Sequence, residues 1–373
     1  MKITFVYWSL RPVGGVERMM ATMMETFIKA GEDVTFVHIR PPTNPTLLTR
    51  LAGVSVVHLN ATNIITTIVR LARFFRNNRP DVAYSAMPTT NIAMLLARLL
   101  SVRRFPIVIS ERADPAGESR MGHSWRYKAA IGLARYAYPF ADHVVCVSQG
   151  LANHVAKAAR IKPERLSVIY NPVVGGKPTA PPSEPPHPWL KDKRHPIVIS
   201  AGRLAEEKDF ATLIDAFAIL RKNGPARLII LGEGDLRAEL QGRIDRLGLT
   251  QDAILPGGVP DISPWLHYAD VFVVSSLYEG FGNALVEAMA VGCQVVSTDC
   301  PFGPREILRA GAHGKLVPVA DAPAMAQAIT ETLQAPIDRD ELKRRSLDFT
   351  VKASMQAYDT LFKRLSGGQG AEQ

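Results

Sequence analysis

Short apolar runs alternate with amphipathic segments along almost the whole chain. The runs are of strand length and almost free of charge, which is typical of strands buried on both faces of a parallel sheet. A first series covers residues 3–8, 34–39, 54–59, 82–86, 107–110, 144–148 and 166–170. A second series covers residues 197–201, 228–231, 271–275, 295–298 and 316–319. Each series predicts one parallel sheet.

The segments between most of these runs have apolar residues at helical spacing, as in residues 17–30 and 91–100. Strands that alternate with helices build doubly wound α/β domains, so two series predict two Rossmann-like domains. Prolines crowd the stretch between the two series. The predicted organisation is therefore a first domain over residues 1–172, a linker over 173–195, a second domain over 196–347 and a final helix over 348–366. Ligands of such sheets bind beyond the carboxyl ends of the strands, and we expect the cleft between the two domains to hold the site.

Composition narrows the class of protein. The chain has 373 residues, of which 47% are apolar and 21% charged, so it is neither disordered, collagen-like nor coiled-coil. The three cysteines suggest a reducing compartment and buried thiols. The longest uncharged stretch, residues 51–69, is too polar to span a bilayer. The first residues predict a buried strand rather than a signal peptide. We therefore expect a cytoplasmic protein.

Charge is unevenly distributed along the chain. Residues 1–172 contain 22 basic and 10 acidic side chains, and the remainder contains 22 basic and 25 acidic ones. The net charge of the whole chain is +9. The first domain is therefore strongly basic, and it should meet an anionic partner such as a nucleic acid, a membrane surface or a phosphorylated substrate.

Two stretches of the basic half combine cations with apolar or aromatic residues. Residues 64–79 have a helical apolar pattern with arginines three apart, and residues 120–140 interleave basic and aromatic side chains. Both patterns suit an anionic lipid surface, although an amphipathic helix packed on its own sheet would look similar. The candidate membrane or acceptor contacts are Arg70, Arg73, Arg76, Arg126 and Lys128.

Two motifs follow predicted strands and carry glycine or positive charge. Gly14 and Gly15 stand between the first strand and a helix, where the backbone can approach an anion closely, although a tight turn alone explains them too. Arg203 and Lys208 follow the first strand of the second domain. They could hold a diphosphate, although each alone would fit a solvated loop. Residues 231–237 contain a weak Gly-x-Gly match, for which a structural turn is the better interpretation.

The strongest signal is the stretch of residues 275–290, in which a buried strand ends in a glycine-rich loop that runs into a helix. The loop amides and the helix N-terminus would cradle an anion. Glu279 lies on the loop and Glu287 on the first turns of the helix, and their carboxylates suit paired hydroxyls. Together these features predict a nucleotide-sugar pocket, with a solvated helix start as the alternative.

These motifs, in this order, resemble the retaining GT-B glycosyltransferases of family 4, and the likeness covers nearly the whole chain. The resemblance implies that Arg203 and Lys208 bind the donor diphosphate, Glu279 the transferred sugar and Glu287 the ribose. It also implies a final helix that crosses back to the first domain. The remaining donor contacts that it implies are backbone groups of Gly14, Gly15, Gly258, Gly280, Phe281, Gly282, Asn283, Ala284 and Leu285.

One residue departs from the family pattern. Many members have a histidine after the fifth strand, whereas this chain has Arg112 in the sequence Ser-Glu-Arg. A guanidinium stays protonated and cannot act as a base. If Arg112 faces the cleft, it would supply charge or hydrogen bonds to a sugar or a phosphate, which fits a mechanism in which the leaving phosphate accepts the proton.

The resemblance leads to one preferred function and two alternatives. The expected enzyme moves a hexose or N-acetylhexosamine from a UDP-linked nucleotide sugar to a polyprenyl-diphosphate-linked glycan at the inner face of the cytoplasmic membrane. No metal or other cofactor is expected, and the sole Asp-x-Asp, at residues 338–340, should be a solvated helix start. The alternatives are a nucleotide-sugar epimerase of the same fold and a basic nucleic-acid-binding protein. No nucleic-acid-binding signature supports the latter.

Overall fold

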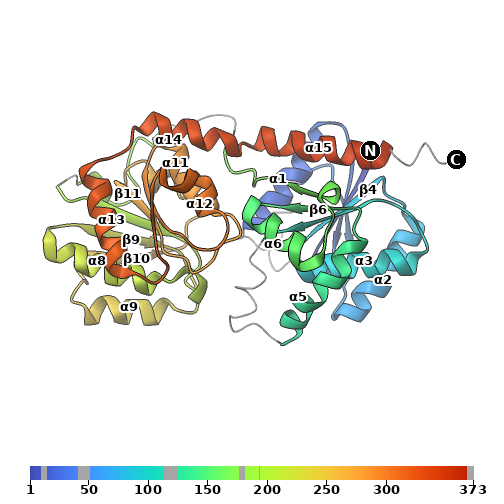
Figure 1. The fold of residues 1–373 in the computed structure, drawn as a ribbon, viewed down its shortest axis with the longest axis horizontal. Helices are drawn as coiled ribbons and strands as arrows, with labels where there is room; N and C mark the ends of the chain where they lie inside the picture. The colour runs from blue at the N-terminus through green and yellow to red at the C-terminus, as the bar shows by residue number, and fades with distance from the viewer. Residues whose placement is uncertain (10–14, 41–50, 113–124, 176–180, 193, 368–373) are drawn as a thin grey trace. The chain divides into compact units, whose positions relative to one another are not determined.

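The structure is a computed structural model that describes residues 1–9, 15–40, 51–112, 125–175, 181–192 and 194–367. The chain divides into two compact units (Figure 1). The first contains residues 1–172 and 351–373, and the second contains residues 173–350. Each unit has its own parallel sheet and its own hydrophobic core.

The sheet of the first unit has seven parallel strands in the order β3-β2-β1-β4-β5-β6-β7. The near-continuous burial of β1, β2, β4, β5 and β6 on both faces accounts for their apolar runs, whereas the edge strands β3 and β7 are only partly buried. The strand bounds are β1 Lys2–Tyr7, β2 Asp33–His38, β3 Ser55–His58, β4 Val82–Ala86, β5 Ile107–Glu111, β6 His143–Cys146 and β7 Leu166–Val168.

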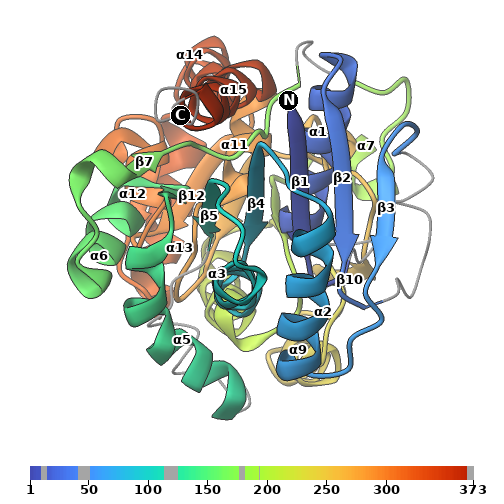
Figure 2. The ribbon, with the colours of Figure 1, turned by 90° about the vertical axis from the view of Figure 1, so that its right-hand side faces the viewer.

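Helices cover both faces of this sheet. One face carries α1 (Gly15–Lys29) and α15 (Val351–Gly367), whose apolar residues join the core formed with the central strands. The other face carries α2 (Ile64–Asn77), α3 (Pro88–Ser101) and α5 (Trp125–Ala137), which lie side by side (Figure 2). The remaining elements are η2 Tyr138–Phe140, α6 Gln149–Ala159 and η3 Pro163–Arg165.

The sheet of the second unit has six parallel strands in the order β10-β9-β8-β11-β12-β13. Their bounds are β8 Ile197–Ala201, β9 Arg227–Leu231, β10 Ala253–Gly257, β11 Val271–Val274, β12 Gln294–Thr298 and β13 Lys315–Val317. The hydrophobic pattern did not predict β10. This strand contains Pro256 and lies at the edge of the sheet, which is where a strand tolerates proline.

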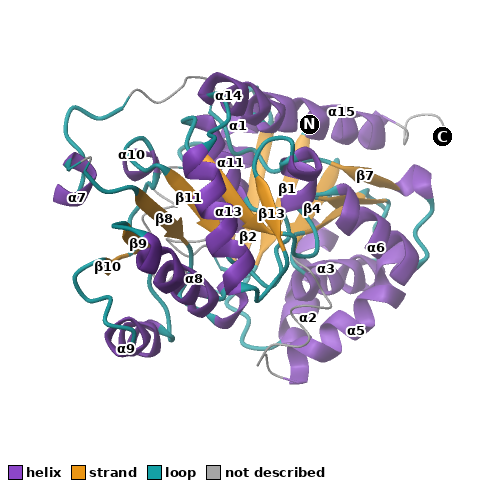
Figure 3. Cartoon of the chain, turned by 60° about the vertical axis from the view of Figure 1, so that its left-hand side comes forward, coloured by secondary structure: helices purple, strands orange, loops and turns teal. Residues whose placement is uncertain are grey.

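Helices α8 (Phe210–Asn223) and α13 (Ala322–Gln334) pack side by side on one face of this sheet (Figure 3), next to α9 (Arg237–Arg246). The other face carries α11 (Asn283–Ala290) and α14 (Arg339–Ser346). The short elements are α7 Pro188–Lys191, η4 Glu206–Lys208, α10 Ser263–Leu266, α12 Pro304–Ile307, η5 Arg309–Gly311 and η6 Leu347–Phe349. No helix of the described residues is both long and apolar enough to span a membrane.

The proline-rich stretch predicted as a linker packs against the second unit. Leu190 is fully buried, the guanidinium of Arg227 lies 5.0 Å from the centre of the Trp189 ring, and Tyr268 donates a hydrogen bond to the carbonyl of Pro182. Prolines prevent regular structure here but not packing, because a rigid extended chain still presents its side chains to a surface.

Candidate active site

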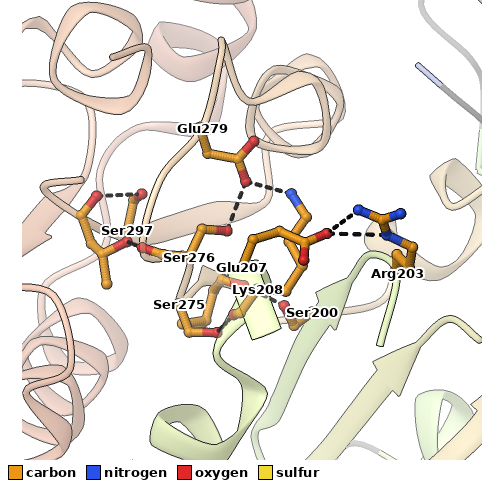
Figure 4. A network of polar contacts seen from close by, with 10 residues as sticks. Ser200, Arg203, Glu207, Lys208, Ser275, Ser276, Glu279 and Ser297 are labelled. Atoms are coloured by element: carbon orange, nitrogen blue, oxygen red, sulfur yellow. Dashed lines mark hydrogen bonds and ion pairs between the residues drawn. The ribbon is translucent and has the colours of Figure 1, made fainter. Parts of the chain in front are cut away.

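The predicted donor residues of the second unit lie beyond the carboxyl ends of two neighbouring strands. Strands β8 and β11 pair in parallel, and the hydroxyl of Ser200 on β8 donates to the carbonyl of Val273 on β11 at 2.6 Å. Lys208 lies on the segment after β8, and Glu279 lies on the loop after β11. Their side chains meet, with Nζ of Lys208 2.6 Å from Oε1 of Glu279 (Figure 4).

Hydrogen bonds between the two loops fix this ion pair. The hydroxyl of Ser275 donates to the carbonyl of Lys208 at 2.7 Å, and the amide of Leu277 donates to the carbonyl of Glu207 at 2.9 Å. The hydroxyl of Ser276 donates to Oε1 of Glu279 at 2.7 Å. Ser276 was not among the predicted site residues, although its position three residues before Glu279 in the loop after a strand is a signal for such a contact.

The ion pair is partly accessible to solvent, because 24% of the Lys208 side chain and 14% of the Glu279 side chain are exposed. Burial alone would lower the pKa of Lys208, but the carboxylate of Glu279 raises it above its usual value. The ammonium therefore stays charged at neutral pH. Burial, and then Glu279, raise the pKa of the nearby thiol of Cys300 to about 12, so this cysteine is no nucleophile.

Arg203 lies on the same loop as Lys208 but is far more exposed. Its Nη2 is 2.6 Å from Oε1 of Glu207, and 66% of its side chain is accessible (Figure 4). The loop is held by close packing against residues 232–234. A Cβ on Gly232 would lie 1.8 Å from the carbonyl oxygen of Gly202, so only glycine fits there. The weak Gly-x-Gly match, predicted to be a structural turn, therefore serves close backbone packing between the two loops.

The glycine-rich loop leads into α11 as predicted, and Glu287 falls within that helix. Gly282 is the N-cap of the helix and has a φ of 110°. It provides no side-chain hydrogen bond to the first amides of the helix, so a ligand would meet backbone groups at this helix start. The side chains of Phe281 and Leu285 are buried in the unit. Any contact that these two residues make with a ligand would therefore come from their backbone. Gly280, Asn283 and Ala284 are half-buried around them.

Gly258 lies beyond β10, at the same edge of the sheet, and is exposed. Its neighbour Gly257 has a φ of 107°, which turns the chain at the end of the strand. In the first unit, Gly15 begins α1 and is exposed, whereas Gly14 lies outside the described residues.

Arg112 follows β5 in the first unit and is buried, with 8% of its surface exposed. Its Nη1 donates to Oδ1 of Asn171 at 2.6 Å, and its Nη2 donates to the hydroxyls of Tyr358 at 3.2 Å and Tyr84 at 3.4 Å. Burial, and then Tyr84, raise the pKa of Tyr358 well above its usual value, so the phenol stays neutral. These hydrogen bonds connect α15 to the carboxyl ends of strands in the first sheet. The predicted role of Arg112 in contacting the sugar stays a prediction.

The predicted membrane contacts differ in their surroundings. Nη1 of Arg70 donates to the carbonyls of Leu59 and Asn60, both at 2.6 Å, so it holds the chain between β3 and α2. Arg73 and Arg76 are exposed on α2. The side chains of Arg126 and Lys128 lie outside the described part of the structure.

Within the described residues, no three or more histidine, cysteine, aspartate or glutamate side chains gather in a way that could hold a metal ion. The site of the second unit instead presents a fixed ammonium, a carboxylate and a helix N-terminus. This combination can bind an anion and accept hydrogen bonds from hydroxyl groups.

Known structures with the same arrangement define the class of fold. The crystal structure of Anabaena HepE in complex with UDP-glucose superimposes with a TM-score of 0.79 and 20% sequence identity, over 98% of this chain and 100% of that one. Two doubly wound parallel sheets in this order constitute the GT-B fold, and the chain has this fold.

Sequence comparisons give the family. Residues 13–174 match the family described as Glycosyltransferase Family 4, and residues 184–348 match the family described as Glycosyl transferases group 1. The two matches together cover most of the chain, which therefore belongs to the GT-B glycosyltransferases built from these two domains. The chain is a glycosyltransferase of the bacterial polysaccharide type.

Two relatives from Campylobacter jejuni are similar over most of their length. The N-acetylgalactosamine-N,N'-diacetylbacillosaminyl-diphospho-undecaprenol 4-alpha-N-acetylgalactosaminyltransferase is 29% identical over 297 residues, which is 78% of this chain and 76% of the relative. The GalNAc-alpha-(1->4)-GalNAc-alpha-(1->3)-diNAcBac-PP-undecaprenol alpha-1,4-N-acetyl-D-galactosaminyltransferase is 26% identical over 367 residues, which is 94% of this chain and 95% of the relative. Both names describe transfer to a glycan on a diphosphate-linked polyprenol.

Proposed function

We propose that this glycosyltransferase moves a hexose or N-acetylhexosamine from a UDP-sugar to a polyprenyl-diphosphate-linked glycan, at the inner face of the cytoplasmic membrane. The observation that carries the proposal is the ion pair of Lys208 and Glu279 beside the glycine-rich loop. Support for the acceptor class comes from the two Campylobacter relatives, and support for UDP comes from the UDP-glucose complex of HepE.

The proposed roles follow from charge and position. The leaving UDP gains negative charge as the bond from the sugar carbon to the phosphate oxygen breaks, and the Lys208 ammonium stabilises that charge. Arg203, exposed on the same loop, binds the diphosphate by turning from Glu207 to it. Glu279 accepts a hydrogen bond from the sugar, and Glu287 binds the ribose.

The transfer proceeds with retention of configuration and without a metal ion. The acceptor hydroxyl attacks the anomeric carbon from the face that the phosphate leaves, its proton passes to the leaving phosphate oxygen, and a glycosidic bond replaces the bond to phosphate. Fixed cations then supply the charge that a divalent metal would otherwise bring. Activity should accordingly survive chelation with EDTA.

The test is a screen of UDP-, GDP- and ADP-sugars for nucleotide release with polyprenyl-diphosphate-linked glycan acceptors. The expected result is UDP release that requires the acceptor, and an α-linked product by NMR from an α-linked donor. Turnover of a UDP-sugar without acceptor would instead identify an epimerase. Binding to RNA or DNA with no nucleotide-sugar turnover at all would overturn the proposal.

A further inference from the structure

Exposed apolar side chains of the chain are concentrated on one face of the first unit. Of the thirteen large apolar side chains that are exposed in the described residues, ten lie on α2, α3, α5 and the short segments that follow α3 and α5. These three helices are neighbours (Figure 2). A soluble surface rarely gathers its apolar residues in this way without a partner.

The most exposed part of this face is the end of α3 together with η2. Leu99, Leu100 and Val102 are 74%, 52% and 87% exposed, and Phe140 is 71% exposed. Nη2 of Arg98 donates to the carbonyl of Phe140 at 2.6 Å, which holds η2 beside the end of α3. We call the four residues Leu99, Leu100, Val102 and Phe140 the apolar edge.

The backbone at the apolar edge is strained. Val102 is the C-cap of α3 and has a φ of 57°, in the left-handed region that glycine or asparagine usually occupies at a helix end. A β-branched residue there is an outlier. Such strain, combined with near-complete exposure of an apolar side chain, points to a role outside the folded unit itself.

The charge of this face identifies the chemistry of its partner. The sequences of α2, α3 and α5 contain no aspartate or glutamate. Arg103 and Arg104 follow Val102 directly and are exposed, and Arg76 reaches the end of α3, where its Nη2 lies 3.5 Å from the carbonyl oxygen of Leu100. Apolar side chains rimmed by arginines match a bilayer with anionic headgroups, because the former enter the acyl region and the latter meet the phosphates.

We propose that the apolar edge inserts into the anionic leaflet of a membrane, and that it, rather than the arginine row of α2, is the main membrane contact. The proposal rests on the proposed function, since a lipid-linked acceptor places the enzyme at a bilayer. Arg70 belongs to the arginine row of α2, and its Nη1 already donates hydrogen bonds to the carbonyls of Leu59 and Asn60. This arginine therefore holds the chain before α2, which favours the apolar edge as the main membrane contact.

The experiment measures binding to vesicles of phosphatidylglycerol and phosphatidylcholine in equal parts by cosedimentation. The variant Leu99→Gln/Leu100→Gln should weaken binding by about tenfold to a hundredfold, because two leucines lose their transfer into the acyl region. The matched control is Leu247→Gln/Leu347→Gln, which changes two leucines of the second unit that are 43% and 57% exposed and should bind like the wild type. Equal binding by both variants would overturn the proposal.

Val102→Gly gives a second readout that a purely structural role would not produce. Glycine relieves the left-handed strain, so the melting temperature should rise, while vesicle binding should fall by several-fold. A rise in both quantities would contradict the proposal.

Further outcomes of these experiments distinguish membrane insertion from the proposed function and from self-association of the chain. If the wild type transfers sugar to a short-chain soluble acceptor but does not bind vesicles, the membrane proposal fails and the proposed function stands. If it binds vesicles through the apolar edge but uses no lipid-linked acceptor, the proposed function fails. A concentration-dependent dimer that is lost in Leu99→Gln/Leu100→Gln, without vesicle binding, would assign the edge to a second copy of the chain.

Discussion

Arg112 of the first unit and Lys208 of the second both follow a parallel strand that ends at a carboxyl edge, yet their surroundings differ. Arg112 is buried against the phenols of Tyr84 and Tyr358 and the side chain of Asn171, so its donors are directed inward. Lys208 is paired with a carboxylate and is a quarter exposed, so a ligand can reach the pair. The position of a cation after a strand indicates a candidate site, whereas its burial and partners decide whether a ligand can use it.

Loss of the Lys208 ammonium should have the largest effect in this comparison. Lys208→Ala should lower kcat by about a hundredfold to a thousandfold, because charge on the leaving diphosphate is no longer stabilised in the transition state. Steady-state kinetics with the donor identified in the screen would measure it. Lys222→Ala, on the exposed surface of α8, is the control and should leave kcat unchanged. An unchanged kcat for Lys208→Ala would remove Lys208 from the proposed mechanism.

The substitution Arg112→Met should mainly lower the stability of the first unit. It removes the guanidinium that donates to the hydroxyls of Tyr84 and Tyr358 and to the amide oxygen of Asn171, which should lower the free energy of unfolding by about 3 kcal/mol. Thermal melting followed by hydrogen exchange on α15 would show the loss.

Arg203→Met is the control for this substitution, because it changes an exposed arginine and should leave the melting temperature almost unchanged. A stable Arg112→Met variant with no turnover would reverse the comparison and place Arg112 among the catalytic groups.

The two glutamates should separate kinetically. Glu287→Ala should mainly raise the donor KM by about 10- to 150-fold, because its hydrogen bonds to the ribose are equally strong in ground and transition states. Glu279→Gln should lower kcat more than it raises KM, because the sugar gains positive charge beside it as the bond breaks. Exchanged effects would mean that the two roles are assigned the wrong way round.

Acid should weaken the first unit through two buried histidines. Burial, and then His58, lower the pKa of His38 to about 4, and burial, and then Arg364, lower the pKa of His143 to about 4. The unfolded chain binds the extra protons below its own histidine pKa of about 6.5, so stability is complete above that value and falls as the pH drops toward 4.

The expected loss at pH 5 is about 2 kcal/mol for each of the two histidines. Hydrogen exchange of peptides from β2 and β6 between pH 7.5 and 5 would measure it. The variant His38→Asn/His143→Asn should show a flatter pH profile than the wild type. An equally steep profile would show that other groups control the acid response.

Most sheet strands were predictable because a strand that is buried on both faces has a continuous run of apolar residues. The run at residues 82–86 matches β4 at both ends, and the run at 197–201 does the same for β8. The edge strand β10 was not predicted, because its proline and its partly exposed positions interrupt the run of apolar residues. The final helix predicted over residues 348–366 is observed as α15, which begins at Val351 and ends at Gly367.

Site residues were predictable as types and positions but not as partners. Lys208 and Glu279 were predicted to follow strands, yet they meet across 71 residues of sequence only because β8 and β11 are neighbours in the sheet. The bond from Arg112 to Tyr358 spans 246 residues and depends on where α15 packs. Such contacts arise from tertiary structure, and no local pattern contains them.

The last helix has a consequence for how the chain is made. Tyr358 and Phe362 of α15 are fully buried in the core of the first unit, although they follow the entire second unit in sequence. A ribosome therefore releases the final piece of the first core only after it has made the whole second unit. Until then, α1 and the central strands expose apolar surface, while the second unit already has all its residues. The first domain to be translated should be the last to reach its native core.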